Sequence, residues 1–143
     1  MTAKEKAEKL HKKVGLFFIS CVGEDGYPLT KAVLSLPAKH KNSLNEIYFC
    51  TNTSSKFAGE IAKNPKASVY FYSKEILIWK GCMLKGNMEI VNDMKIKERL
   101  WDDKYKEAYL PEKSPSCPDY CVLKFTPISG RYYTWYKIED FEI

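Results

Sequence analysis

Residues 46–65 read EIYFCTNTSSKFAGEIAKNP, and this stretch decides the fold. It begins with an apolar, aromatic run typical of a β-strand and ends with an amphipathic pattern typical of a short helix, which Asn64-Pro65 terminates. A cluster of hydroxyl residues separates the two. We expect a strand over 46–51, then a helix from about Ser54 to Asn64 with Ser54 as its N-cap.

The start of this helix carries an unusual charge pattern. Its first turn offers Ser54, Ser55 and Lys56, and no acid precedes Glu60. A helix N-terminus exposes unpaired N–H groups and about half a positive charge, which an acidic residue normally offsets. Two interpretations stay open on these residues alone: an ordinary capped helix, or a phosphate site built from hydroxyls, N–H groups and the lysine.

The length and composition indicate one globular domain over residues 1–143. The hydrophobic content of 45% is enough to bury a core. No apolar run approaches the roughly 18 residues of a membrane-spanning helix, and no secretory signal pattern opens the chain, so we expect a cytoplasmic protein with no membrane contact. The odd count of five cysteines favours reduced thiols over a disulfide framework.

The positive charge is concentrated at the beginning of the chain. Of the net charge of +5, residues 1–13 contribute five lysines against Glu5 and Glu8. Ala3, Ala7 and Leu10 share one side of this segment, which predicts an amphipathic helix lying on the domain with its lysines in water. Contact with an acidic partner is the alternative.

The rest of the chain is mostly strand. We expect a hairpin of strands 16–22 and 27–36, a strand over 66–72, a long bent strand over 76–91, and strands over 120–125 and 131–137 around a turn at 126–130. A helix capped by Asn92 or Asp93 should run to about Tyr109, and loops should cover 37–45 and 111–118. Six to seven mainly antiparallel strands with short helices fit either a barrel or a two-layer α+β sheet.

Lys31 has an unusual position in the second strand. Alternation places it with Leu29 and Val33 on one face, which is a mostly buried surface. A lysine among apolar neighbours is a candidate anion ligand.

Few side chains offer chemistry of their own. The two histidines, His11 and His40, stand in lysine-rich contexts, and the spacing Cys117-x-x-x-Cys121 has no second pair, so we expect no metal site. No nucleophile, Rossmann or P-loop motif is present. We therefore name no catalytic residue and expect binding or a borrowed cofactor.

The order of the motifs GYPLTKAVLSLP, IYFCTNTSSKFAGEIAKNPKASVYFY, MLKGNMEIVND, PDYCVLKFTP and RYYTWY resembles that of the pyridoxamine 5′-phosphate oxidase-like FMN-binding split barrels, and more narrowly their general stress protein branch. The resemblance runs from about Val14 to Lys137. It implies a split β-barrel that binds FMN, and a homodimer with two FMN molecules in clefts between the subunits.

The resemblance also implies site residues. Lys31 would reach the FMN phosphate, and the backbone of Ala32 and Val33 would lie beside the flavin ring. The family's aromatic-x-Thr strand end matches Phe49 and Thr51. The Ser-Lys that follows it matches Ser55 and Lys56, which would bind the phosphate. The candidate cofactor-binding residues are Lys31, Ala32, Val33, Phe49, Cys50, Thr51, Ser54, Ser55, Lys56 and Trp135.

The chain also departs from the oxidases proper. Lys31 stands where arginine is common, Phe57 stands where those enzymes carry a second basic residue, and their C-terminal Trp and Arg have no clear counterpart. Oxidation of pyridoxamine phosphate itself is therefore not expected.

Three functions remain open. The first is an FMN-dependent oxidoreductase that uses NADH, NADPH or another small redox partner. The second is a flavin-binding stress or redox-sensing protein without turnover. For either of these functions, a deazaflavin or haem is an alternative cofactor in the same fold. The third is a nucleic-acid-binding barrel, suggested by the basic balance and the tyrosines but weakened because no basic residues are interleaved with Tyr70, Tyr72, Tyr132, Tyr133 and Tyr136.

Overall fold

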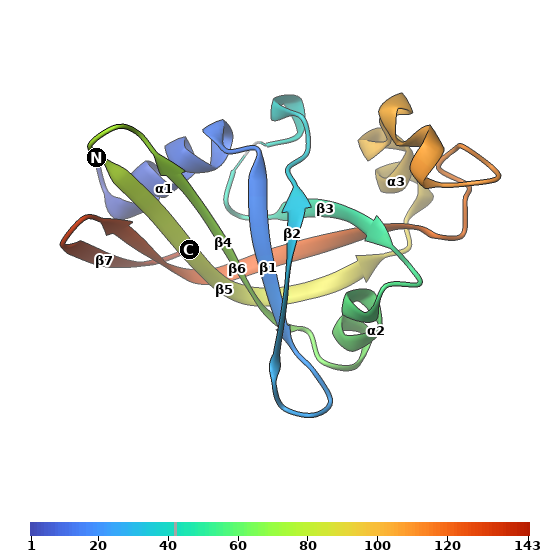
Figure 1. Ribbon diagram of the computed structural model, residues 1–143, viewed down its shortest axis with the longest axis horizontal. Coiled ribbons are helices and arrows are strands. Elements are labelled where there is room, and N and C mark those ends of the chain that lie inside the picture. Colours follow the sequence, from blue (N-terminus) through green and yellow to red (C-terminus); the bar gives the residue numbers. More distant parts are fainter. Residues whose placement is uncertain (42) are drawn as a thin grey trace.

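The computed structural model describes residues 1–41 and 43–143, which form seven β-strands, three α-helices and two short 3-10 helices (Figure 1). Their bounds are α1 Ala3–Lys13, β1 Leu16–Val22, β2 Pro28–Leu34, η1 Ala38–His40, β3 Ile47–Asn52, α2 Lys56–Lys63, β4 Lys66–Lys74, β5 Trp79–Val91, α3 Met94–Leu100, η2 Asp103–Ala108, β6 Tyr120–Thr134 and β7 Lys137–Glu142. The predicted loop over 37–45 contains η1, and Asn42 lies outside the described residues.

The seven strands make one antiparallel sheet. Its strand order is β2-β1-β4-β5-β6-β3, and β7 pairs with the second half of β6. The sheet curls so that its two edge strands, β2 and β3, lie next to each other (Figure 1). Within the described ranges no hydrogen-bonded ladder joins β2 to β3, so the barrel is split rather than closed. This confirms the predicted mainly β split barrel over the two-layer alternative.

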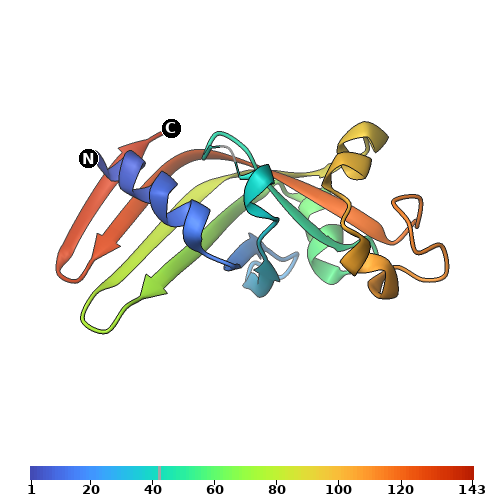
Figure 2. The same ribbon diagram turned by 90° about the horizontal axis from the view of Figure 1, so that it is seen from above.

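The main core fills the inside of the curled sheet. Phe17, Phe49 and Phe71 are completely or almost completely buried there and meet edge to face. Helix α1 lies along this side of the sheet, over the strands β4 to β7 (Figure 2). Its Ala7 and Leu10 belong to the core, as its amphipathic pattern predicts.

His11 is part of this packing. Its ring is 2% exposed and lies against Phe17 and Phe71. Burial lowers the pKa of His11 to about 4, and nearby Lys41 adds to the effect. His11 is therefore neutral at pH 7 and fills space in the core.

A second, smaller core lies on the opposite face of β3 and β6. It is covered by α3 and η2, which contribute Leu100 and Tyr109, and β6 supplies Tyr120. The rings of Tyr109 and Tyr120 meet at 5.0 Å, and Trp101 contacts both. This cluster holds the end of β3 and the segment that follows it in place.

The predicted single helix over 93–109 is wrong. Asp93 caps α3, as expected, but the helix ends at Leu100 and the backbone of Trp101 is extended. Asp102 then accepts a hydrogen bond from the N–H of Lys104 and begins the separate helix η2. The side chain of Asp102 hydrogen-bonds to the backbone ahead of it, and this local bond competes with continuation of α3.

The predicted turn over 126–130 is also wrong, because β6 runs unbroken from Tyr120 to Thr134. Pro127 and Gly130 are residue types that favour turns, which is why the sequence suggested one. In the structure, β6 stays paired with β5 on both sides of this segment, and a register shift at Lys85/Gly86 of β5 accommodates it. The turn lies later, at Trp135-Tyr136, and is followed by the unpredicted strand β7.

The strand expected over 76–91 begins only at Trp79. Glu75 and Ile78 exchange backbone hydrogen bonds, which places Ile76 and Leu77 in the β4–β5 turn. Their side chains are 98% and 77% exposed. The predicted start of this strand at residue 76 is therefore wrong, because it rested on the apolar character of Ile76 and Leu77, which lie in the turn.

Gly86 offers a test of this register. A Cβ at this position would lie 2.2 Å from the carbonyl oxygen of Thr126, which is backbone and cannot move aside. We expect Gly86→Ala to lower the free energy of unfolding by at least about 2 kcal/mol, measured by urea denaturation. Gly59→Ala is the matched control: its Cβ would meet nothing within 4 Å, and α2 should gain about 0.5–1 kcal/mol. Equal changes in the free energy of unfolding for the two variants would contradict the close contact between Gly86 of β5 and Thr126 of β6.

Candidate functional site

The candidate site lies where the edges of β2 and β3 approach each other. Lys31 projects inward from β2, and its Nζ donates a hydrogen bond of 2.5 Å to Oγ1 of Thr51 on β3. The same Nζ is 5.5 Å from the centre of the Phe57 ring. Burial lowers the pKa of Lys31, since the charged form is partly desolvated. The prediction that Lys31 faces the inside is confirmed, and its ammonium bridges the split.

The N-cap of α2 is Ser55, so the prediction of Ser54 is wrong. Ser55 has extended backbone angles, and its Oγ accepts a hydrogen bond of 3.1 Å from the N–H of Ala58. Ser54 stands one residue earlier, with its side chain exposed. The helix begins at Lys56, whose side chain is exposed at the first helical position.

The N-terminus of α2 lacks an acidic residue and has backbone donors without partners among the described residues. Its first turn contains no acidic residue. Among the hydrogen bonds of residues 1–41 and 43–143, none uses the backbone N–H groups of Lys56 and Phe57. Two free donors and the positive end of the helix dipole therefore coincide at one place, and the exposed Lys56 is the first residue of the helix. Lys31 lies close by, since its Nζ contacts Phe57 of the same helix.

Asp119 organises this turn and was not found by sequence reasoning. Its Oδ1 accepts from the N–H of Ser54 at 2.8 Å, and its Oδ2 accepts from Nδ2 of Asn52 at 2.6 Å. These hydrogen bonds, that of the Ser54 backbone first, lower the pKa of Asp119. The carboxylate satisfies donors outside the helix and leaves those of the first helical turn free.

Two further contacts fix the end of β3. The hydroxyl of Tyr109 donates a hydrogen bond of 2.7 Å to the carbonyl oxygen of Thr51. Oγ1 of Thr53 donates to the carbonyl oxygen of Pro118 at 2.8 Å. Both contacts join positions about 60 residues apart, so no local sequence signal could reveal them.

The other predicted residues of β2 and β3 point in different directions. Val33 and Phe49 are buried in the main core, so their backbones rather than their side chains are available to a ligand. Ala32 is exposed on the outer face of the sheet. Cys50 faces the second core, 4.0 Å from the hydroxyl oxygen of Tyr120, and burial raises the pKa of its thiol to about 11.

Trp135 does not join the other predicted residues within one chain. It occupies the turn between β6 and β7, at the opposite end of the sheet from α2 (Figure 1). Its backbone has a φ of 46° and its side chain is 56% exposed. Any contact between Trp135 and the Lys31 region would have to come from a second copy of the chain.

Residues 1–41 and 43–143 hold no cluster of three His, Cys, Asp or Glu side chains that could bind a metal ion. None of their helices has the length and apolarity to cross a bilayer.

Comparison with known families and structures gives one consistent result. The family model described as pyridoxamine 5′-phosphate oxidase matches residues 3–134. A search of curated proteins found no significant match.

Three solved structures illustrate the similarity. A protein from Clostridium acetobutylicum related to general stress protein 26 of B. subtilis is 32% identical, with a TM-score of 0.82 and coverage of 100% of this chain and 97% of the other. An FMN-binding pyridoxamine 5′-phosphate oxidase-related protein from Nostoc punctiforme is 16% identical, with a TM-score of 0.69 and coverage of 97% and 95%. A haem-binding protein from Mycobacterium smegmatis is 14% identical, with a TM-score of 0.78 and coverage of 99% and 58%. The last two show the fold alone.

The role of Asp119 can be tested by pH. Because its pKa is lowered in the folded chain, its contribution to stability is complete above the ordinary carboxyl range and is lost as the pH falls through the lowered pKa. We expect Asp119→Asn to lose less stability than wild type on acidification below about pH 4, measured as the thermal unfolding midpoint from pH 6 to pH 2. Glu112→Gln, at an exposed position, should follow the wild-type curve. Parallel curves for wild type and Asp119→Asn would contradict the assignment.

Proposed function

Because this chain belongs to the pyridoxamine 5′-phosphate oxidase family, we propose that it is an FMN-binding flavoprotein acting as an FMN-dependent oxidoreductase. The observation that carries the proposal is the meeting of Lys31 with the open N-terminus of α2 at the split between β2 and β3. The five cysteines are all free thiols, which is typical of a protein in a reducing compartment such as the cytoplasm.

The donor set suits a phosphate monoester. The Lys31 and Lys56 ammonium groups, the Ser54 and Ser55 hydroxyls and the free N–H groups of the first helical turn all favour a dianion. The nearby Asp119 carboxylate opposes it, but hydrogen bonds to Asn52 and Ser54 already engage its two oxygens. Lysine in place of arginine at position 31 supplies a point charge rather than a bidentate fork.

The flavin ring would lie along β2. Among the strands of the described residues, β2 pairs with β1 alone, so the backbone groups on its other edge are available to hydrogen-bond a planar heterocycle near Ala32 and Val33. When bound, FMN supplies the chemistry by accepting or donating an electron pair as a hydride. The residues of this chain bind the phosphate, orient the ring through backbone contacts and exclude water from one of its faces.

The outer face of the sheet supports a homodimer. The strand registers place Leu16 beside Leu34, and Phe18 between Ala32 and Tyr70. Leu34 is 74% exposed, so this row is a continuous apolar surface beside the proposed flavin. Association of two such faces would bury the row and would bring a second chain, with its Trp135, toward the ring.

A flavin store or redox sensor without turnover is the second candidate. Burial raises the pKa of Cys50 to about 11 and that of Cys82 to about 12, so neither offers a thiolate nucleophile for turnover at pH 7, and any redox sensing would depend on the flavin. Stopped-flow mixing of the flavin-loaded protein with NADH or NADPH separates the two functions. Reduction within seconds supports the oxidoreductase, and bleaching over many minutes supports the store.

The phosphate site is tested by reversing its charges. We expect Lys31→Glu with Lys56→Glu to abolish FMN binding and to leave a folded dimer, measured by flavin content per chain and by elution volume in size-exclusion chromatography. Lys56→Glu alone changes only an exposed side chain and should weaken FMN binding without a risk to folding.

The control for net charge is Lys12→Glu with Lys95→Glu, which alters two exposed positions outside the site. It should bind FMN like wild type. Full flavin occupancy in the Lys31/Lys56 variant would refute the proposed site.

A further inference from the structure

A cavity lies between α1 and the open end of the sheet. Its volume is about 440 Å³, within the range of small-molecule sites. Residues of α1, of the β4–β5 hairpin and of β6 line it: Met1, Lys6, Lys9, Leu10, Lys13, Ser73, Glu75, Lys80, Tyr132 and Thr134. We call this cavity the α1 groove. None of the proposed phosphate ligands belongs to it.

The α1 groove has a positive rim. Lys6, Lys9 and Lys13 project from one side of α1, and Lys80 stands on β5. Glu75 is the one acid among the lining residues. Three of the α1 lysines therefore gather at a concave site, which the sequence did not predict, while Lys9, Lys12 and Lys13 are exposed to solvent as expected.

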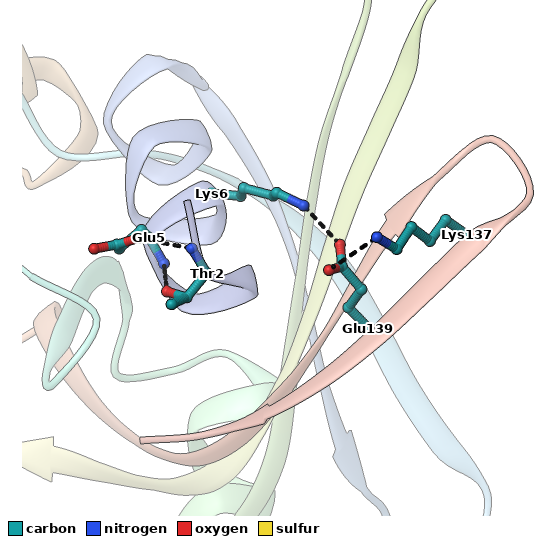
Figure 3. A network of polar contacts seen from close by, with 5 residues as sticks. All are labelled: Thr2, Glu5, Lys6, Lys137 and Glu139. Atoms are coloured by element: carbon teal, nitrogen blue, oxygen red, sulfur yellow. Dashed lines mark hydrogen bonds and ion pairs between the residues drawn. The ribbon is translucent and has the colours of Figure 1, made fainter.

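Only one of these lysines is neutralised by an ion pair in the described part of the chain. Lys6 reaches Glu139 on β7 at 2.9 Å, as Figure 3 shows, and Glu139 also contacts Lys137. This pair ties the start of α1 to the last strand. Among residues 1–41 and 43–143, no ion pair engages Lys9, Lys13 or Lys80.

The floor of the groove is apolar and elongated. Leu10 and Tyr132 close the bottom of the groove and are only 4% and 3% exposed, so the accessible apolar surface comes from Met1, which is 76% exposed, and from the methylene stems of the lysines. The lining follows α1 from its first turn to its last, and eleven helical residues span about 16 Å. Such a shape accommodates an extended chain better than a compact ring system.

We propose that the α1 groove binds an amphipathic anion, namely a carboxylate on an unbranched apolar chain of the fatty-acid class. The alkyl chain lies against Met1 and the lysine stems, above Leu10 and Tyr132, and the carboxylate is held by Lys9, Lys13 and Lys80 at the rim. Apolar burial provides most of the affinity, and the lysines select the charged head group.

The test is isothermal titration calorimetry of the full chain with decanoate below its micellar concentration. We expect one site per chain. Decanol removes the charge and butyrate removes most of the apolar chain, and each should bind about tenfold or more weakly than decanoate. Repeating the titration with excess FMN should leave the decanoate affinity unchanged, because the groove does not include the proposed flavin site.

Matched variants locate the site. Lys9→Gln with Lys13→Gln removes two rim charges from α1, keeps good helix formers and should weaken decanoate binding about tenfold. Lys4→Gln with Lys12→Gln removes the same charge from the same helix away from the groove, and should stay within about twofold of wild type. Unchanged unfolding midpoints establish that both variants are folded.

Several outcomes would overturn the proposal. These are no binding of decanoate, equal affinity for decanoate and decanol, or equal weakening by the two pairs of substitutions. Binding to anionic phospholipid vesicles without binding of monomeric decanoate would also overturn it, since it would assign the lysines of α1 to a membrane surface.

Discussion

The hydrogen bond from Lys31 to Thr51 crosses the one place where the sheet does not close. In residues 1–41 and 43–143, every other neighbouring pair of strands is joined by a backbone ladder, whereas no ladder joins the facing edges of β2 and β3. A side chain rather than a ladder therefore bridges the split, and the backbone edge of β2 remains free to bind. The position of α2 follows from the same arrangement, because Phe57 packs beneath the ammonium and brings the first turn of the helix beside Lys31. The FMN site that we propose depends on this opening in the sheet.

Local sequence pattern predicted the parts of this arrangement that depend on neighbouring residues. Alternation along 27–36 placed Lys31 on the inner face, and the start of the helix after Thr51 is free of acids as the sequence indicates. Anion binding at that helix start stays a prediction. The failures arose where distant parts of the chain decide the local structure. Pro127 and Gly130 mimic a turn, yet the register shift opposite Gly86 keeps β6 continuous. Asp119 lies 65 residues from Ser54 in sequence, so its hydrogen bond to the turn before α2 could be seen only in three dimensions.

The fold gives the lysines at the beginning of the chain a specific arrangement that their sequence pattern does not reveal. From the sequence they form a solvated face, and part of that interpretation holds, since Ala7 and Leu10 bury the opposite side of α1. The fold adds the β4–β5 hairpin and β6 beside the helix, and three of the five lysines come to line a cavity with an apolar floor. The chain thus presents two cationic sites at different places, one at the split of the barrel and one under α1. The first offers helix N–H groups suited to a phosphate, and the second offers an apolar surface suited to an alkyl chain.

The central claim is that the opening between β2 and β3 recognises the phosphate of FMN. It is tested most directly by a fluorescence titration of the purified, flavin-free protein with FMN and with riboflavin, which share the ring and differ in the phosphate. Loss of the contacts to Lys31, Lys56 and the N-terminus of α2 should weaken riboflavin binding by at least about 100-fold relative to FMN. Equal affinities for the two flavins, or failure to bind either, would contradict this account.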